Sequence, residues 1–432
     1  MTNLQITKGM RDFPPEEKIV RDEIASTIKQ SFELYGFNPI ETPILERYET
    51  LAAKFAAGEE SDALKETFKL TDQGKRELGL RFDLTVPFCR FVGMNPNFKA
   101  PFKKYCSGNV FRDGPIKTGR YRQFMQMDPD IVGAKSMLAD AEILSLTETI
   151  FGKLGFDVVI ELNNRKIIDG VMDSVKIPEK DRFNVIISID KLKKAGEDNV
   201  RKELKEKGLK DNQIKKIISC FKAGKDNNKT LANLRKLLKN VTGKEGVKET
   251  EELLDYLDMF NVKNVVFNPS LARGLAYYTG PVFEVFMKDS GIKSSIAAGG
   301  RYDKIIGSYL QTNKEFPATG ISFGIDVITE ALKEKKRVAK KSVVKVFVIP
   351  IGTLKESIKV VQRLRGEGIN ADFDIAGRGI SKNLQYVDSY EIPYAVFIGG
   401  DELKMKKVKL RDMKSGKEEM VSVEDVVKRL KE

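Results

Sequence analysis

Alternate residues between positions 120 and 131 carry a graded series of groups that could hold a nucleotide and an amine. At the two-residue period of a strand, one face would present cations, then an aromatic ring, then carboxylates: Arg120, Arg122, Phe124, Gln126, Asp128 and Asp130. Guanidinium groups suit a phosphate chain, the ring suits a flat base, and carboxylates suit a cation. Arg112 lies just upstream. The alternative is a solvated strand face of mixed charge, which this stretch alone leaves open.

The absence of histidine narrows the chemistry that the chain could perform. None of its 432 residues is histidine, which excludes histidine-based acid–base catalysis, Ser–His and Cys–His pairs, and His-ligated metals. Cys89, Cys106 and Cys220 are too widely spaced to indicate a zinc site or a disulfide framework, and they favour a reducing, cytoplasmic location. We therefore expect no metal held by the protein itself, and chemistry based on substrate charge, arginine and a substrate-borne metal.

Two further segments carry candidate binding groups. In LRFDLTVP, Arg81, Asp83 and Thr85 would share a face of a strand. A carboxylate beside a hydroxyl suits an ammonium group, although both residues also favour helix caps, and the residue types alone favour the cap. In ARGLAYYTG, Arg273 precedes two adjacent tyrosines. Neighbours on a strand face opposite sides, so only one tyrosine would share the face of Arg273 unless the backbone kinks at Gly274.

The net charge of +13 predicts a polyanionic partner such as nucleic acid, with solubility as the alternative reason for the lysines. No apolar run is long enough to span a bilayer, and residues 1–9 lack a signal-peptide core. We therefore expect no membrane association.

The elements that would position these groups follow from turn and helix signals. Strand-like runs flank a loop containing Gly114, Pro115 and Gly119, so residues 105–131 are predicted to form an antiparallel hairpin. We divide the chain into a strand-rich catalytic domain in two halves, a lysine-rich helical insertion, a charged linker and a C-terminal α/β domain with a mixed sheet: 1–170 and 261–332, 171–260, 333–341, and 342–432.

Seven segments resemble, in their order along the chain, the histidyl-tRNA synthetases, a family of class II aminoacyl-tRNA synthetases. They are KGMRDFPP, GFNPIETPILE, LRFDLTVPFCRFV, FRDGPIKTGRYRQFMQMDPDIVG, ARGLAYYTGPVFE, AAGGRYD and ATGISFGID. LRFDLTVP resembles archaeal and eukaryotic members more than bacterial ones. The resemblance implies an α+β fold: an antiparallel sheet flanked by helices, a helical insertion, and a C-terminal anticodon-binding domain.

The resemblance also assigns roles by position. The catalytic residues would be Arg112, which holds the substrate carboxylate and the α-phosphate, and Arg273. The histidine-binding residues would be Asp83, Thr85, Arg112, Gln126, Asp130, Arg273, Tyr277 and Tyr278. Among them, Asp83, Thr85 and Gln126 would hold the α-amino group, whereas Asp130 and Tyr278 would contact the imidazole. The ATP-binding residues would be Arg112, Arg120, Arg122, Phe124 and Gly320, with Phe124 stacking on adenine. For Gly320, packing alone is the alternative.

The implied activity is ATP-dependent ligation of L-histidine to the 3' end of tRNA(His) through histidyl-adenylate, with Mg²⁺ bound through the ATP phosphates. The implied assembly is a cytoplasmic homodimer that contacts its second copy near residues 36–50. The alternative is a catalytically inactive relative, either the regulatory subunit of histidine biosynthesis or a sensor of uncharged tRNA. Two departures concern ATP, because Gly114 stands where an acidic residue is expected and Val327 where an arginine is expected to stack on ATP.

Overall fold

A computed structural model describes most of the chain, namely residues 4–53, 65–95, 97–116, 120–222, 224, 226–272, 277–288, 290–334 and 340–431. The polypeptide divides into two compact units. One comprises Met1–Arg11 and Ile24–Lys336, and the other comprises Asp12–Glu23 and Arg337–Glu432. None of the described helices combines the length and the apolar character that crossing a membrane would require.

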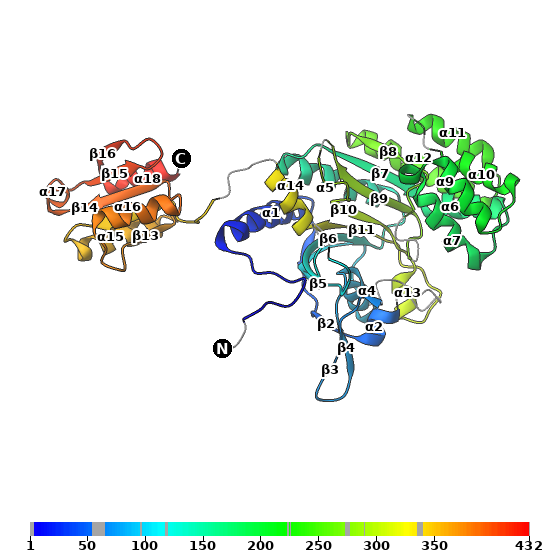
Figure 1. Cartoon of the computed structure of the whole chain (residues 1–432), viewed down its shortest axis with the longest axis horizontal. Coiled ribbons are helices and arrows are strands. Elements are labelled where there is room, and N and C mark those ends of the chain that lie inside the picture. The colour runs from blue at the N-terminus through cyan, green and yellow to red at the C-terminus, as the bar shows by residue number, and fades with distance from the viewer. Residues whose placement is uncertain are drawn as a thin grey trace. The chain divides into compact units, whose positions relative to one another are not determined.

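An eight-stranded sheet forms the centre of the larger unit (Figure 1). Its strands, in spatial order, are β1 (Asn38–Ile40), β5 (Phe102–Phe111), β6 (Gln123–Val132), β11 (Ala318–Gly324), β10 (Ala297–Arg301), β9 (Pro281–Met287), β7 (Val158–Asn164) and β8 (Val265–Phe267). The inner pairs are antiparallel, whereas β1 with β5 and β7 with β8 are parallel. The predicted α+β fold is confirmed, with the correction that parallel pairs at both edges make the sheet mixed.

Aromatic packing fixes two helices on one face of this sheet. The Phe32 ring of α1 (Pro15–Leu34) lies 5.3 Å from the Tyr105 ring and 5.8 Å from the Phe323 ring, centroid to centroid. Phe151 of α5 (Leu138–Leu154) lies 5.6 Å from the same Phe323 ring. Tyr105 and Phe323 alternate along their strands with residues that face the other way. These two helices therefore cover one face of the sheet, and the side chains that alternate with Tyr105 and Phe323 point to the other face.

Short elements surround that opposite face. Pro43 lies between β1 and β2 (Leu45–Arg47), and β2 pairs with β4 (Glu77–Leu80) in a separate three-stranded sheet that also contains β3 (Lys69–Thr71). Three helices accompany them: α2 (Tyr48–Ala53), α4 (Thr85–Met94) and α13 (Ile305–Tyr309). α14 (Ile325–Glu334) follows directly after β11.

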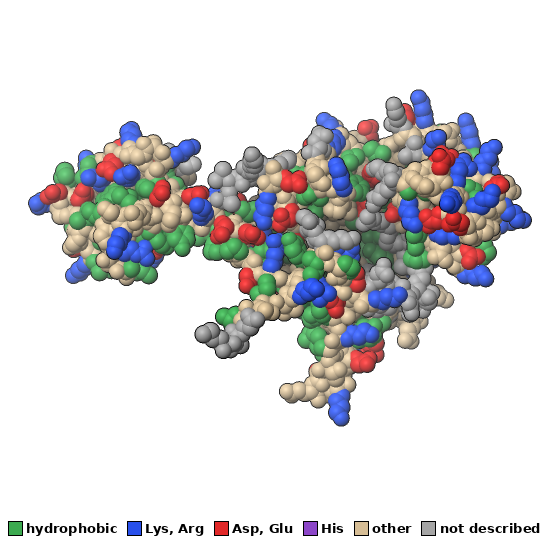
Figure 2. Space-filling view, in the orientation of Figure 1, with side chains coloured by type: hydrophobic (Ala, Val, Ile, Leu, Met, Phe, Trp, Pro, Cys, Tyr) green, Lys and Arg blue, Asp and Glu red, His purple; other side chains and the backbone are tan. Residues whose placement is uncertain are grey.

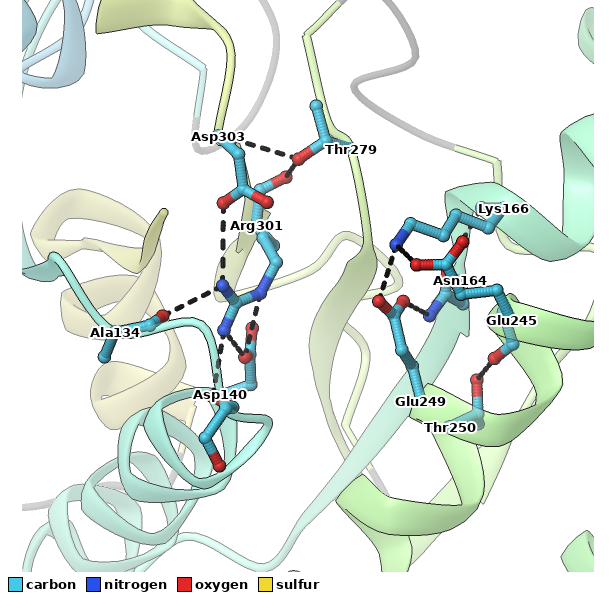
Figure 3. Close-up of polar contacts among 12 residues, drawn as sticks. Ala134, Asp140, Asn164, Lys166, Glu245, Glu249, Thr250, Thr279, Arg301 and Asp303 are labelled. Carbon is cyan, nitrogen blue, oxygen red and sulfur yellow. Dashed lines mark hydrogen bonds and ion pairs between the residues drawn. The ribbon is translucent and has the colours of Figure 1, made fainter. Parts of the chain in front are cut away.

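The described residues of the lysine-rich segment form helices, as predicted. They are α6 (Arg165–Ser174), α7 (Glu179–Asp190), α8 (Leu192–Ala195), α9 (Glu197–Glu206), α10 (Asp211–Phe221), α11 (Asn227–Leu237) and α12 (Val241–Met259). Lys166 joins α6 to α12 through Glu245 at 2.7 Å and Glu249 at 2.6 Å (Figure 3). Figure 2 shows lysine and arginine side chains spread over these helices, with acidic side chains between them.

The smaller unit holds a five-stranded mixed sheet in the order β13-β12-β14-β15-β16. Its elements are β12 (Val346–Pro350), α15 (Leu354–Gly366), β13 (Ala371–Phe373), α16 (Ile380–Ser389), β14 (Tyr394–Ile398), α17 (Gly400–Lys404), β15 (Val408–Asp412), β16 (Glu418–Val421) and α18 (Val423–Lys431). β12 pairs in parallel with β13 and β14, and the last two strands are antiparallel. The predicted α/β mixed-sheet domain is therefore confirmed.

A buried ion pair connects the sheet to α5. The guanidinium of Arg301, at the end of β10, donates to the Asp140 carboxylate and to the carbonyl oxygens of Ala134 and Ser136 (Figure 3). Thr319 of β11 donates to the same carboxylate at 2.8 Å. Because removing either charge would leave the other buried with weaker compensation, this pair fixes β10 and β11 against α5.

Candidate active site

A cavity of about 370 Å³ opens on the face of the sheet opposite α1 and α5. Small residues form its floor on the two central strands: Ala298 and Gly300 on β10, and Gly320, Ser322 and Gly324 on β11. Register pairs Gly300 with Gly320, so that the small residues of the two strands lie side by side. Larger polar and aromatic side chains line the rim. The hollow exists because the central strands contribute almost no side-chain volume on this face.

The carboxyl half of the predicted graded face lines the cavity. Gln126, Asp128 and Asp130 alternate along β6 and all three contribute to the lining. The cationic half is arranged differently, because β6 begins at Gln123 rather than at residue 120. Arg120 and Arg122 therefore precede the strand, and the prediction of one continuous strand over 120–131 is wrong at its start.

Arg112 lies at the cavity's cationic end. Its backbone N–H donates to the carbonyl oxygen of Arg122 at 2.8 Å, which extends the hairpin past β5. Its Nε donates to the carbonyl oxygen of Phe82 at 3.0 Å, and its guanidinium lies 5.0 Å from the centroid of the Phe124 ring. Burial lowers the pKa of Arg112, and the charge of Asp83 opposes that shift. A guanidinium stays protonated in either case, so the cavity keeps a fixed cation.

The other two predicted phosphate-binding cations are held by carboxylates. Arg120, 54% exposed at its side chain, lies 3.6 Å from Glu66, and Arg122 lies 2.9 Å from Asp113. Arg120, Arg122 and Phe124 are not among the described residues that line the cavity. Phe124 instead packs against the cluster of Leu84, Cys106 and Val110.

Glu66 also explains the glycine at position 114. A Cβ placed on Gly114 would lie 2.5 Å from a Glu66 carboxylate oxygen. The Glu66 carbonyl oxygen accepts from the Asp113 N–H at 2.7 Å, which holds the two segments together. A carboxylate from a distant segment therefore lies beside the position where the family resemblance expects an acidic residue.

Asp83 and Thr85 both line the cavity. Asp83 Oδ1 accepts from the Val86 N–H at 2.9 Å at the start of α4, so the helix-cap alternative also holds. The predicted shared face with Arg81 is wrong because β4 ends at Leu80. Arg81 turns away and donates to the carbonyl oxygens of Thr42 and Asn109 at 2.8 and 2.9 Å.

Tyr277 and Tyr278 line the cavity together, although they are adjacent in sequence. They precede β9, outside regular strand structure, so strand alternation does not separate them. Their ring centroids are 4.2 Å apart, and the Tyr277 hydroxyl donates to the Tyr278 hydroxyl at 3.0 Å. Burial raises the pKa of Tyr278 well above its ordinary value, which keeps that hydroxyl protonated. Arg273, the other predicted catalytic residue, lies outside the described residues.

Asp130 is held by two partners that sequence reasoning missed. Its carboxylate accepts from the Tyr302 hydroxyl and forms an ion pair with Lys104, whose side chain is fully buried on β5. A Cβ on Gly320 would lie only 1.9 Å from Asp130 Oδ1. The close neighbour of this glycine is therefore the Asp130 carboxylate, which supports the packing alternative for Gly320.

Asp128 lines the cavity although the family resemblance assigns it no role. It lay on the predicted graded face. Its side chain is 3% exposed, and its Oδ1 has no hydrogen-bond partner among the described residues. Burial raises the pKa of Asp128 to about 7, Asp130 adds to that shift, and Lys104 opposes it. The ligand-free cavity thus contains a carboxyl group that titrates near neutrality.

Other lining residues come from strands that only the fold brings together. Glu284 and Val282 reach the cavity from β9, Ser295 and Ile296 precede β10, and Val327 comes from α14. Strand order across the sheet is set by distant pairings, so no local sequence signal could have found the residues on and before β9 and β10. Val327 alone among them was identified from the sequence, as a departure from the family pattern.

Comparisons with known proteins agree over the whole chain. A family model described as histidyl-tRNA synthetase matches residues 9–328, and one described as anticodon binding domain matches residues 345–432. Histidine--tRNA ligase 1 of Bacillus cereus is 43% identical over 429 residues, which cover 98% of each chain. Histidine--tRNA ligase of Clostridium tetani is 38% identical over 437 residues, 99% of this chain and 98% of the relative. Both relatives are bacterial, so they do not support the expectation that this chain is more similar to archaeal and eukaryotic members of the family.

Solved structures show the same fold. The crystal structure of histidyl-tRNA synthetase from a Nostoc species superposes with a TM-score of 0.89 at 31% identity, covering 100% of this chain and 99% of that one. A Bacillus halodurans structure, named as an ATP phosphoribosyltransferase regulatory subunit/histidyl-tRNA synthetase, has a TM-score of 0.75 at 23% identity and covers 91% and 97%. At that identity the second likeness concerns the fold alone.

The burial of Asp128 predicts a pH-dependent gain in stability for Asp128→Asn without ligand. Below about pH 4 the carboxyl is protonated whether the chain is folded or unfolded, and it contributes nothing. Between its ordinary pKa of 3.8 and its folded pKa of about 7, the unfolded chain loses the proton first, so the wild type loses stability as pH rises. At about 1.36 kcal/mol per pKa unit, the loss reaches about 4 kcal/mol above pH 7.

Denaturant unfolding of both proteins at pH 5 and pH 8, followed by a probe in the larger unit, measures this gain. The advantage of Asp128→Asn should be larger at pH 8. A difference between the two proteins that does not change with pH would contradict the assigned burial of the charge.

Proposed function

The chain belongs to the histidyl-tRNA synthetase family, and we propose that it is an ATP-dependent histidine–tRNA ligase that works in the cytoplasm. One observation carries the proposal. A single cavity brings the Arg112 cation together with Asp83, Thr85 and Gln126 and with Asp130 and Tyr278. A zwitterionic amino acid needs a cation for its carboxylate, acceptors for its ammonium group and polar groups for its ring. Seven of the eight predicted histidine-binding residues supply this set, and the eighth is Arg273.

The residue types fit adenylate formation without a general base. The carboxylate of histidine is ionised at neutral pH and is itself the nucleophile. One carboxylate oxygen forms a bond to the α-phosphorus of ATP, and the bond from that phosphorus to the bridging oxygen breaks, so pyrophosphate leaves with the electron pair. Arg112 would neutralise charge on the phosphoryl oxygens as it develops. A terminal ribose hydroxyl of the tRNA then forms the ester, and AMP leaves.

The outer phosphates would be held by Arg120 and Arg122, once their ion pairs with Glu66 and Asp113 open. Mg²⁺ would enter on the phosphates of ATP and neutralise part of their charge. Among the described residues, no group of three or more Asp, Glu, Cys or His side chains is arranged to hold a metal ion, so the phosphates would be its main ligands. Phe124 would stack on adenine. The guanidinium of Arg112, which now lies 5.0 Å from the centroid of this ring, would have to move away from the ring face first.

Selectivity for histidine would come from buried polar groups at the far end of the cavity. Asp130 is fixed by Lys104 and Tyr302, and Tyr278 is fixed by Tyr277. A substrate without ring nitrogens would leave these groups unpaired, which a buried site penalises strongly.

The catalytically inactive alternative is less well supported. Relatives named histidine--tRNA ligase match this chain over almost its full length, and the anticodon-binding domain is present. A sensor of uncharged tRNA, which would bind tRNA without activating histidine, is the remaining rival, and Val327 at the expected arginine position is the observation behind it.

We propose further that the helical segment 171–260 contacts the acceptor arm of tRNA(His) and that two copies of the chain associate near residues 36–50. Basic side chains over the helices support the first part (Figure 2). Reversing the charge of lysines on α9 and α10 should reduce the salt dependence of tRNA binding, because fewer counterions are released. An unchanged slope of binding against salt concentration would contradict the proposed contact.

Histidine-dependent exchange between pyrophosphate and ATP tests the proposed activity. The wild type should catalyse it, and Arg112→Ala should slow it by roughly two to three powers of ten because a fixed transition-state cation is lost. Arg273→Ala should abolish exchange while histidine binding persists.

Arg363→Ala is a matched control, because it removes a half-exposed arginine of α15 in the smaller unit. It should leave the exchange rate unchanged. Binding of tRNA by the wild type without any exchange would identify a sensor rather than a ligase.

A further inference from the structure

Four carboxyl groups line the cavity, and they differ in how completely they are satisfied: Asp83, Asp128, Asp130 and Glu284. Glu284 accepts from the Ser295 hydroxyl at 3.4 Å. Asp130 is held by Lys104 and Tyr302, and Asp83 accepts from the start of α4. Asp128 lies between them along the lining, 3% exposed, with one oxygen that has no hydrogen-bond partner among the described residues. A buried polar atom of this kind requires an explanation, and a ligand that binds it is one.

The charges around Asp128 leave room for one more cation. The groups that face it are Lys104 and Cys106 on β5, Gln126 and Asp130 on β6, Ser322 on β11, Tyr278 before β9, and Asp83 and Arg81 before α4. Lys104 is committed to Asp130, and Arg81 is committed to backbone carbonyls. Once the substrate carboxylate binds Arg112, that cation no longer compensates the cavity's acidic groups.

We propose that Asp128 binds the α-ammonium group of the amino-acid substrate, together with Asp83. This inference rests on the proposed function and adds a binding residue that the family resemblance does not assign. An ammonium group carries three N–H donors, so it can bond Asp83, Asp128 and one further acceptor of the lining at once. The ring then extends toward Asp130 and Tyr278. The α-ammonium is the favoured partner because it is a permanent cation at neutral pH, whereas the imidazole is mostly neutral there.

A proton must move when such a contact forms. Without ligand the carboxyl of Asp128 is partly protonated near neutral pH, since its pKa is about 7. A bound ammonium group favours the ionised form, so the proton leaves to solvent and the Asp128 oxygens accept from the substrate. By linkage, histidine binding should weaken about tenfold between pH 8 and pH 6 through this group alone.

Titration calorimetry of the full chain in buffers of different ionisation enthalpy measures the released protons. Histidine should release about half a proton at pH 7 from Asp128, and more at pH 6. A histidine analogue that carries a hydroxyl in place of the α-amino group keeps the ring and should not cause this release. The comparison uses only the wild type, so it does not depend on how well a variant folds.

Asp128→Asn should bind histidine without the release and should lack the tenfold change with pH. Glu161→Gln is the matched control, because it removes a buried carboxyl of β7 outside the cavity and should keep the wild-type release. Equal release by histidine and the hydroxyl analogue would assign the contact to the ring and overturn the proposal, as would no release at all. Absence of histidine binding by the wild type would instead overturn the proposed function itself.

Discussion

Compensation of buried charge on one face of a sheet is the constraint on which this site depends. A carboxylate buried without a partner is costly, so each one must be paired, protonated or matched by a ligand. Asp130 is paired with Lys104, while Asp128 has a pKa raised by burial to about 7. The cavity exists at all because β10 and β11 carry glycine, alanine and serine beneath these groups. The same residues therefore determine both the packing and the chemistry of the site. A Cβ on Gly320 would lie only 1.9 Å from Asp130 Oδ1, so any larger residue there would displace this carboxylate.

The sequence allowed prediction of those parts of the site that depend on local periodicity. The alternation along 124–130 placed Gln126, Asp128 and Asp130 on one face, and all three line the cavity. Prediction failed where backbone geometry changes within a few residues. The end of β4 at Leu80 turns Arg81 away from Asp83, and irregular backbone before β9 puts both tyrosines on one side. Tyr302 could not be found, because only the tertiary fold brings it to Asp130. Lys104 lies opposite Asp130 in the hairpin of β5 and β6, but its place depends on the register, which could not be predicted from the sequence.

The departures from the family pattern have different physical outcomes. At Gly114, the carboxylate of Glu66, from a distant segment, lies beside the position where an acidic residue was expected. At Val327, the side chain lines the cavity without the charge that an arginine would have supplied. The effect of a substitution within a motif thus depends on all the side chains that surround it in the fold. The spacing of the motif alone does not predict which side chains those are.

A crystal structure of the chain with bound L-histidine is the most direct test of the central claim that one cavity holds the substrate by complementary charge. The substrate carboxylate should lie on Arg112, the α-ammonium within about 2.7–3.2 Å of Asp83 and Asp128 oxygens, and the ring beside Asp130 and Tyr278. Histidine bound at another place, or bound with its ammonium group pointing away from both aspartates, would contradict the assigned site.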